Sequence, residues 1–376
     1  MTEKIARFFA ENTPATPCLV VDLDVVANNY DKLHEALPEA RIFYAVKANP
    51  APEILKLLVE QGSCFDTASI PEIQYCLQAG ATPDRVSFGN TIKKASDIAR
   101  AHALGIGLFA FDSMEELEKI AEHAPGARVF CRILTSGEGA DWPLSRKFGC
   151  EPEMATELLL AAASMNVVPY GVSFHVGSQQ RDLTQWDFAL AQTAQIFRDL
   201  EEKGVMLRMV NMGGGFATRY LKDIPSESEY GNAIEDSLRK HFGNRLPETI
   251  IEPGRSMVGN AGVIRSEVVL ISRKSHRDDR RWVYLDIGKF GGLAETMDEA
   301  IKYKIQTPHD GGPAEPVILA GPTCDSADVL YEKTDYPLPV DLRIGDKIDI
   351  LATGAYTTTY SAVNFNGFSP LASYYI

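Results

Sequence analysis

Between residues 40 and 255 the sequence alternates eight short β-rich runs with helix-like segments, and this alternation limits the possible folds more than any other feature. The predicted strands occupy residues 42–49, 64–69, 86–90, 107–113, 127–134, 169–177, 206–215 and 249–255. Segments between them, such as 52–62 and 71–80, open with proline and close with glycine, which is typical start and stop chemistry for helices. Helical crossovers force neighbouring strands to pair in parallel, so the pattern predicts an α/β fold with a (β/α)8 TIM-type barrel over residues 25–255.

The pattern changes after residue 255. Runs such as 280–288 and 346–356 alternate with turns and show little helical periodicity, which predicts a C-terminal β-sheet or β-barrel domain. We expect residues 1–24 to join residues 256–376 in this second domain, because the segment CLVVDLD has the character of a strand. Residues 135–149 form an irregular insertion in the barrel pattern, and GADWPLSRKFG within it suggests a mobile loop over the site.

The composition excludes several classes of protein. The 376 residues carry a formal charge of −14, which disfavours a nucleic-acid partner. No apolar run approaches the roughly 18 residues of a membrane span, and the N-terminus does not read as a secretory signal. The six cysteines are scattered and there is no HExxH motif, so we expect a cytoplasmic protein without a disulfide framework or a metal site.

Polar and glycine residues recur where the predicted barrel strands end. They are Lys47, Asp66, Asn90, Arg132, His175, Gly213–Gly215, Glu252 and Arg255. Active sites of such barrels lie at the carboxyl ends of the strands. A lysine at that edge, partly stripped of water, can attack a carbonyl, although a single lysine there would more often extend into solvent.

The last two strand ends predict a phosphate site. Three consecutive glycines, Gly213, Gly214 and Gly215, let backbone N–H groups converge on an anion, and loops after strands seven and eight often hold phosphate in these barrels. Arg255 suits a bidentate phosphate contact, whereas Glu252 is expected to pair with a cationic group of the same ligand. A ligand with a phosphate, a protonatable ring nitrogen and an aldehyde that reacts with lysine is pyridoxal 5′-phosphate.

Two further residues fit this cofactor. His175 could lie over the pyridine ring, and Ser178 could donate to the phosphate. A single histidine at a strand end is otherwise about as often structural as functional, so His175 depends on its neighbours for this interpretation.

Seven motifs in the chain carry a family resemblance. They are FYAVKANP, FDTASIPEI, GVSFHVGS, NMGGGF, IEPGR, GPTCDSAD and GAYT. Together they resemble the pyridoxal-phosphate decarboxylases of the alanine racemase-like fold, the group IV decarboxylases, and most of all the ornithine and bacterial lysine/ornithine decarboxylases. The resemblance covers nearly the whole chain, with the motifs in the family's order.

The resemblance implies a role for each matching residue. Lys47 would hold the cofactor covalently, Glu252 would pair with the pyridinium nitrogen, and His175 would stack on the ring. Asp66, Glu72 and Arg132 would form the charged support around Lys47. The phosphate ligands would be Ser178, Gly213, Gly214, Gly215, Arg255 and Tyr356.

The resemblance also implies a head-to-tail homodimer with two shared active sites. Cys324 would protonate the carbanion after carbon dioxide leaves, and Asp325 would bind the distal ammonium of the substrate, both acting in the partner subunit's site. Within GGLAETMDEA, Glu295, Asp298 and Glu299 could supply a second acidic contact, and we favour Asp298.

The substrate is expected to be a basic amino acid. Aspartate after Cys324 favours ornithine, converted to putrescine in polyamine biosynthesis, or lysine, converted to cadaverine, over diaminopimelate, whose decarboxylases have glutamate there. One methylene separates ornithine from lysine, so strict and dual specificity both remain open. A racemase of this fold would place arginine against the ring nitrogen in place of Glu252. A non-catalytic regulator would tend to lose Lys47 or Cys324, and both are present.

Overall fold

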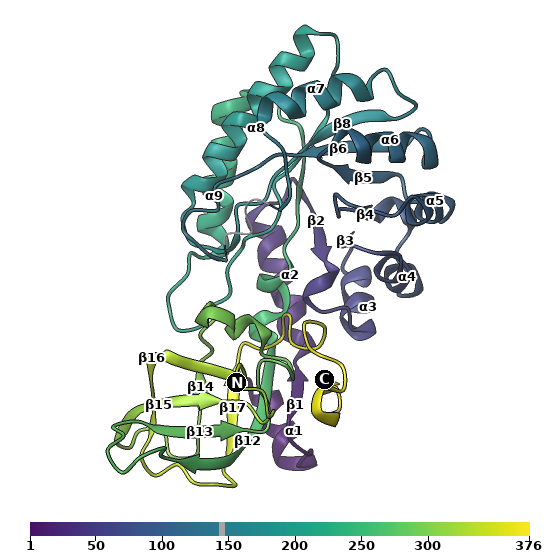
Figure 1. The fold of residues 1–376 in the computed structure, drawn as a ribbon. Helices are drawn as coiled ribbons and strands as arrows, with labels where there is room; N and C mark the ends of the chain where they lie inside the picture. Colours follow the sequence, from purple (N-terminus) through teal and green to yellow (C-terminus); the bar gives the residue numbers. More distant parts are fainter. Residues whose placement is uncertain (143–146) are drawn as a thin grey trace. The chain divides into compact units, whose positions relative to one another are not determined.

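The computed structural model divides the chain into two compact units (Figure 1). One, here called the barrel unit, comprises Ala27–Ala217 and Ile224–Ser256. The other, the sheet unit, comprises Met1–Val26, Thr218–Asp223 and Met257–Ile376.

The barrel unit contains a closed barrel of eight strands, each parallel to its two neighbours. The strands are β2 (Ala40–Ala45), β3 (Cys64–Thr67), β4 (Val86–Phe88), β5 (Leu108–Phe111), β6 (Arg128–Arg132), β8 (Val168–Ser173), β10 (Met209–Asn211) and β11 (Glu248–Ile251). The barrel predicted from the alternating pattern is confirmed.

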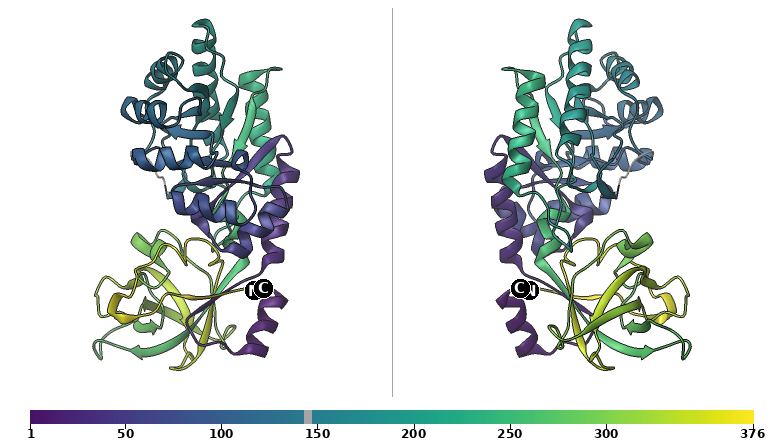
Figure 2. Two further views of the ribbon diagram at one scale, coloured as in Figure 1. Left: turned by 90° about the vertical axis from the view of Figure 1, so that its right-hand side faces the viewer. Right: turned by 90° about the vertical axis from the view of Figure 1, so that its left-hand side faces the viewer.

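Helices surround the barrel on its outside (Figure 2). They are α2 (Leu23–Ala36), α3 (Pro52–Glu60), α4 (Ile70–Gln78), α5 (Ala95–Ala103), α6 (Met114–His123), α7 (Pro152–Ala162), α8 (Thr184–Glu202) and α9 (Glu227–Phe242). Local sequence explains where several of them begin. A proline occupies the first or second position of α3, α4 and α7. The side chains of Ser69 and Ser113 accept hydrogen bonds from the first turns of α4 and α6.

Apolar side chains from seven of the barrel strands form one buried cluster. It consists of Phe43, Cys64, Leu108, Ala110, Phe130, Tyr170, Met209 and Ile250. These residues point inward because side chains alternate between the two faces of a strand. The barrel interior is therefore a packed core, and polar groups gather beyond it, at the carboxyl ends of the strands.

The structure describes residues 1–142 and 147–376. Within the insertion after β6, a short strand, β7 (Ala140–Trp142), pairs antiparallel with β9 (Ser178–Gln180). The mobile loop predicted over 139–149 includes residues 143–146, which lie outside the described part of the chain. None of the helices in the described ranges has both the length and the apolar character that crossing a bilayer requires.

The sheet unit is built on a mixed sheet of eight strands. They are β1 (Cys18–Val21), β12 (Gly262–Ser272), β13 (Arg281–Leu285), β14 (Ile305–Gln306), β15 (Ala314–Ala320), β16 (Val329–Pro339), β17 (Lys347–Leu351) and β18 (Ala372–Tyr375). As the sequence predicts, the N-terminal β1 joins this sheet, where it pairs with β12 and β18. Helix α1 (Glu3–Asn12) contributes Ile5 and Phe9 to a core cluster with Cys18, Val20 and Val263.

Strand β16 is not evident from the sequence, because its residues VLYEKTDYPLP lack a clear alternation. The strand lies at one end of the sheet and pairs with β15. An edge position tolerates Pro337 and Pro339, because an edge strand does not need every backbone donor.

We predict that Gly171→Ala destabilises the protein. Gly171 is buried in β8, and a Cβ there would lie 2.1 Å from the carbonyl oxygen of Met209 in the adjacent strand. Overpacking of this kind costs about 1–3 kcal/mol, so the midpoint of urea unfolding should fall. The matched control is Gly107→Ala, because a Cβ at residue 107 meets no atom within 4 Å. Equal midpoints for the two variants would contradict the prediction.

Candidate active site

Lys47 lies just beyond the carboxyl end of β2, in the short 3-10 turn η1 (Val46–Ala48). The predicted strand included this residue, but β2 ends at Ala45, so the prediction was wrong by a few residues. Both neighbours of Lys47 in the turn are buried, whereas Lys47 itself is exposed. The hydroxyl of Tyr44 donates to the carbonyl oxygen of Asn49 at 2.9 Å and fixes the chain after the turn. The backbone therefore leaves the lysine at the edge of the barrel core.

Three carboxylates lie near enough to Lys47 for its charge to act on them. Asp66 is in β3, Glu72 is in α4, and Glu252 follows β11. Burial raises the pKa of each carboxyl group, and the positive charge of Lys47 lowers it. For Asp66, the nearby Glu252 charge raises the pKa further, while the hydroxyl of Ser87 donates to the carboxylate at 3.1 Å. The acids and the lysine form one electrostatic group.

Arg132, the last residue of β6, belongs to the same group. Burial lowers the pKa of its guanidinium, and the negative charges of Glu252, Asp112 and Asp66 raise it. Its guanidinium carbon lies 5.4 Å from the centre of the Phe148 ring. Arg132 thus supplies a second cation near two of the same carboxylates, Asp66 and Glu252.

His175, which follows β8, is held as a neutral ring. Burial lowers its pKa well below the usual value, and the charges of Arg132 and Lys47 lower it further. The backbone N–H of Gly177 donates to Nδ1 at 3.0 Å, so the proton of the neutral ring belongs on Nε2. A neutral, flat imidazole at this position can pack against a planar ligand.

Glu252 has a partner that the sequence analysis did not single out. Asn211, the buried last residue of β10, donates from Nδ2 to Oε1 of Glu252. The amide oxygen of Asn211 accepts from the backbone N–H of Gly213 at 3.0 Å. Asn211 therefore orients both the carboxylate and the start of the glycine segment. An asparagine two residues before a run of three glycines was the available signal in the sequence.

The three glycines after β10 each lie where a side chain would not fit. A Cβ would lie 2.2 Å from the carbonyl oxygen of Phe174 at Gly213, and 2.6 Å from that of Glu252 at Gly214. At Gly215 it would lie 2.7 Å from the carbonyl oxygen of Gly177. Gly213 and Gly215 also have φ values of +65° and +105°, which favour glycine. The segment therefore needs glycine at all three positions.

Arg255 and Ser178 meet beside this segment. Arg255 begins the short helix α10 (Arg255–Val258), is only 4% exposed, and donates from Nε and a terminal nitrogen to Oγ of Ser178, each at 3.2 Å. A buried guanidinium next to a hydroxyl has the donor set that binds phosphate oxygens. Tyr356, also predicted as a phosphate ligand, belongs to the sheet unit and has a φ of +59°.

Cys324 and Asp325 are exposed residues of the sheet unit. The backbone N–H of Cys324 donates to Oδ1 of Asn366 at 3.1 Å, and Nδ2 of Asn366 lies 3.3 Å from the thiol sulfur. This asparagine, which the sequence analysis did not identify, holds the cysteine at two points. The buried Asp328 accepts from the backbone N–H and the hydroxyl of Thr323, the residue before Cys324. The loop that presents the thiol is thus fixed from both sides.

The three acidic residues near 295–299 differ in their surroundings. They lie in η4 (Ala294–Glu299), also in the sheet unit. Glu295 is buried and Asp298 is exposed. Glu299 is partly buried, and its carboxylate accepts hydrogen bonds from residues of β16. Of the three, Asp298 is the most accessible to a ligand.

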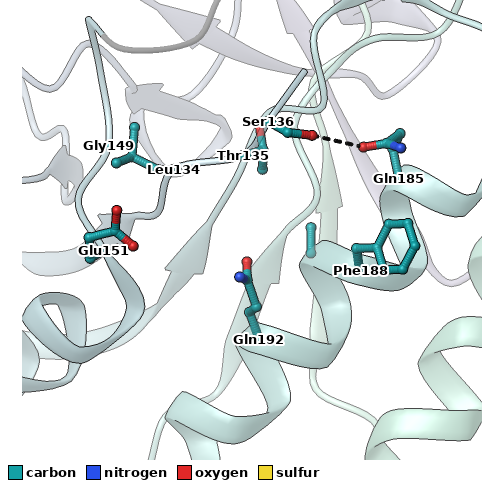
Figure 3. Close-up of a pocket in the computed structure, with 9 residues that line it drawn as sticks. Leu134, Thr135, Ser136, Gly149, Glu151, Gln185, Phe188 and Gln192 are labelled. Atoms are coloured by element: carbon teal, nitrogen blue, oxygen red, sulfur yellow. Dashed lines mark hydrogen bonds between the residues drawn. The ribbon is translucent and has the colours of Figure 1, made fainter. Parts of the chain in front are cut away.

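A cavity of about 710 Å³ lies in the barrel unit, between the segment after β6 and α8 (Figure 3). Thr135, Ser136, Gln185 and Phe188 line it, and the Ser136 hydroxyl donates to the Gln185 side chain at 3.3 Å. None of the predicted site residues lines this cavity. We therefore locate the candidate site by its charged residues and its glycine segment, and not by the volume of this cavity. In the part of the chain that the structure describes, no group of three or more His, Cys, Asp or Glu residues could hold a metal ion.

The chain is similar to known proteins in sequence and in fold. The family model "pyridoxal-dependent decarboxylase, pyridoxal binding domain" matches residues 23–259. The lysine/ornithine decarboxylase of Selenomonas ruminantium is 35% identical over 98% of this chain and 91% of its own length. The chloroplastic ornithine decarboxylase of Nicotiana glutinosa is 33% identical over 94% of this chain and 82% of its own. The crystal structure of SrLDC with PLP and cadaverine matches with a TM-score of 0.88 at 34% identity, covering 100% of this chain and 93% of that one.

We predict that Arg132→Gln raises the pKa of His175, because the Arg132 charge is one of the causes that lower it. A pH titration of ¹⁵N-labelled imidazoles by NMR measures the change. The control is Arg128→Gln, at the other end of β6, where the guanidinium carbon lies 4.9 Å from the centre of the Tyr170 ring. An unchanged His175 pKa in Arg132→Gln would show that the two side chains are not coupled.

Proposed function

The chain belongs to the pyridoxal-dependent decarboxylases, and on that premise we propose that it converts L-ornithine to putrescine, a step of polyamine biosynthesis. It is a pyridoxal 5′-phosphate-dependent amino-acid decarboxylase that acts on a basic amino acid. The observation that carries the proposal is the electrostatic group around Lys47, in which partly buried acids and a neutral histidine adjoin a glycine segment.

The residues present fit this cofactor. A segment with no room for side chains at Gly213, Gly214 and Gly215 suits a phosphate held by backbone donors, and Arg255 with Ser178 adds a buried cation and a hydroxyl. We assign Tyr356 to the same phosphate. Lys47 would hold the cofactor covalently through its amine. When bound, pyridoxal 5′-phosphate supplies an electron sink for the pair that departing carbon dioxide leaves behind.

The remaining residues of the barrel unit would keep the cofactor in its reactive state. Glu252, oriented by Asn211, would pair with the ring nitrogen and keep it protonated. His175 would lie on the ring without adding charge to it. Asp66, Glu72 and Arg132 would balance the charge around Lys47 during substrate exchange.

Residues of the sheet unit would handle the substrate. We assign proton delivery to the α-carbon to the thiol of Cys324, which Asn366 holds in place. Asp325 and Asp298 would bind the distal ammonium, because both are exposed carboxylates. Discrimination against lysine then depends on one methylene, which is worth about 1–3 kcal/mol in a binding pocket.

The proposal includes a head-to-tail homodimer in which Cys324 and Asp325 complete the partner subunit's site. On the single chain both residues are exposed. Near them in sequence, beside Asn366, the apolar side chains of Val363, Phe365 and Phe368 are 79%, 36% and 45% exposed. An apolar surface of this kind supports contact with a second copy. We also propose a cytoplasmic location, because all six cysteines are free thiols.

Two other functions are less well supported. A diaminopimelate decarboxylase of this fold would have glutamate where this chain has Asp325. A non-catalytic regulator would not need both Lys47 and Cys324, which this chain retains.

We predict that an equimolar mixture of ornithine, lysine, arginine and diaminopimelate yields mainly putrescine, detected by mass spectrometry. Cadaverine should be at least about tenfold less abundant, given the value of one methylene in a binding pocket. Equal amounts of the two diamines would indicate a dual enzyme. Lysine formed from diaminopimelate would contradict the assignment of Asp325. The Lys47→Ala variant, which should form no diamine and show no visible absorbance from bound cofactor, is the negative control, and Lys56→Ala on an exposed helix face should behave as wild type.

We predict that Lys47→Ala and Cys324→Ala subunits, each nearly inactive alone, regain activity when mixed. In a dimer with shared sites, half of the mixed dimers are hybrids with one intact site, which gives about a quarter of the wild-type rate. The matched control mixes Lys47→Ala with Glu252→Ala. Both changes lie in the barrel unit, so every site in that mixture stays damaged. Recovery in neither mixture would contradict shared sites.

A further inference from the structure

The turn that carries Asp298 has an unusual backbone. Inside η4 the helical geometry breaks at Met297, and Asp298 and Glu299 follow with φ values of +51° and +57°. Two consecutive residues with side chains in the left-handed region are strained, and such a conformation persists only where the surrounding structure holds it. Contacts with neighbouring residues must therefore hold this turn in place.

The carboxylate of Glu299 holds the turn against β16. Oε1 accepts from the backbone N–H groups of Glu332 at 2.8 Å and Lys333 at 2.6 Å. Oε2 accepts from the backbone N–H of Thr334 at 2.9 Å and from its hydroxyl at 2.5 Å. Burial raises the pKa of Glu299, but these four donors outweigh it and hold the pKa below its ordinary value. The Glu299 carboxylate therefore stays ionised and hydrogen-bonded to β16.

The chain after the turn is fixed by the same strand. Tyr331 donates from its hydroxyl to the carbonyl oxygen of Ile301 at 3.0 Å and accepts from the backbone N–H of Tyr303 at 2.9 Å. Tyr336 donates to the carbonyl oxygen of Tyr303 at 2.8 Å and accepts from the N–H of Ile305 at 3.0 Å. The two buried rings stack 5.1 Å apart. β16 thus determines the backbone from residue 299 to residue 305, and Asp298 lies at the exposed end of this fixed segment.

We propose that Glu299 is a positioning residue, which sets the placement of the Asp298 carboxylate and through it the discrimination between ornithine and lysine. The inference rests on the proposed function, in which Asp298 contacts the distal ammonium. The two substrates differ by one methylene, so the position of this carboxylate decides which ammonium it meets. Glu299 does not touch the substrate in this scheme, because its oxygens are engaged by β16.

The test is Glu299→Gln in the holoenzyme. Glutamine keeps the size of the side chain but places an NH₂ group against backbone donors, so the turn loses part of its attachment. We expect the ratio of kcat/KM for ornithine to that for lysine to fall about tenfold, mainly through a higher KM for ornithine, with kcat and the absorbance of the bound cofactor retained. An equal loss of kcat/KM for both substrates would mean that Glu299 has only a structural role, and it would overturn the inference.

A matched control and a second variant keep the result interpretable. The control is Asp310→Asn, which replaces another carboxylate of the sheet unit. The Asp310 carboxylate accepts from the backbone N–H and the hydroxyl of Thr307, and its replacement should not change the ratio of the two kcat/KM values. If Glu299→Gln does not fold, Thr334→Val removes one of the four donors without altering η4 and should shift the ratio in the same direction by a smaller factor. Wild-type protein that forms neither diamine would refute the proposed function itself, whereas an active wild type with an unchanged variant ratio would refute only the role of Glu299.

Discussion

Closure of the parallel barrel is the constraint on which the candidate site depends. Parallel pairing of eight strands turns all their carboxyl ends toward one edge, while the apolar cluster around Phe43 and Phe130 fills the interior below. Residues separated by about two hundred positions in the sequence, such as Lys47 and Glu252, consequently act on each other's charge. Closure pairs β11 with β2, so that Glu252 after β11 acts on the same group as Lys47 after β2.

The charges gathered at this edge stabilise one another only as a set. Burial disfavours the ionised forms of Asp66 and Glu252, and the cations of Lys47 and Arg132 favour them. Removal of one member leaves its partners buried without a counter-charge, which is more costly than loss of a surface pair. His175 stays neutral in the same surroundings. The arrangement suits a ligand that carries its own charges into the site.

In the sheet unit, hydrogen bonds to the backbone fix the candidate residues in place. Its candidate substrate residues, Cys324, Asp325 and Asp298, are exposed, and buried or partly buried polar groups beneath them fix the backbone. Asp328 holds the loop before Cys324, and Glu299 holds the turn at Asp298. Rigid attachment of exposed side chains prepares them for a ligand without a large loss of conformational freedom on binding.

The sequence by itself determined the barrel, the addition of β1 to the second sheet, and the set of strand-end residues, because strand and helix periodicity and the positions of glycine are local signals. It did not reveal Asn211 or Asn366, since an asparagine hydrogen-bonds to partners that folding brings near. It favoured Asp298 over Glu299 but supplied no physical reason for that choice. Neighbouring acids look alike in a sequence. Only the tertiary structure shows that Glu299 bonds to backbone donors of β16, more than thirty residues away, and so holds the turn, whereas Asp298 is presented by it.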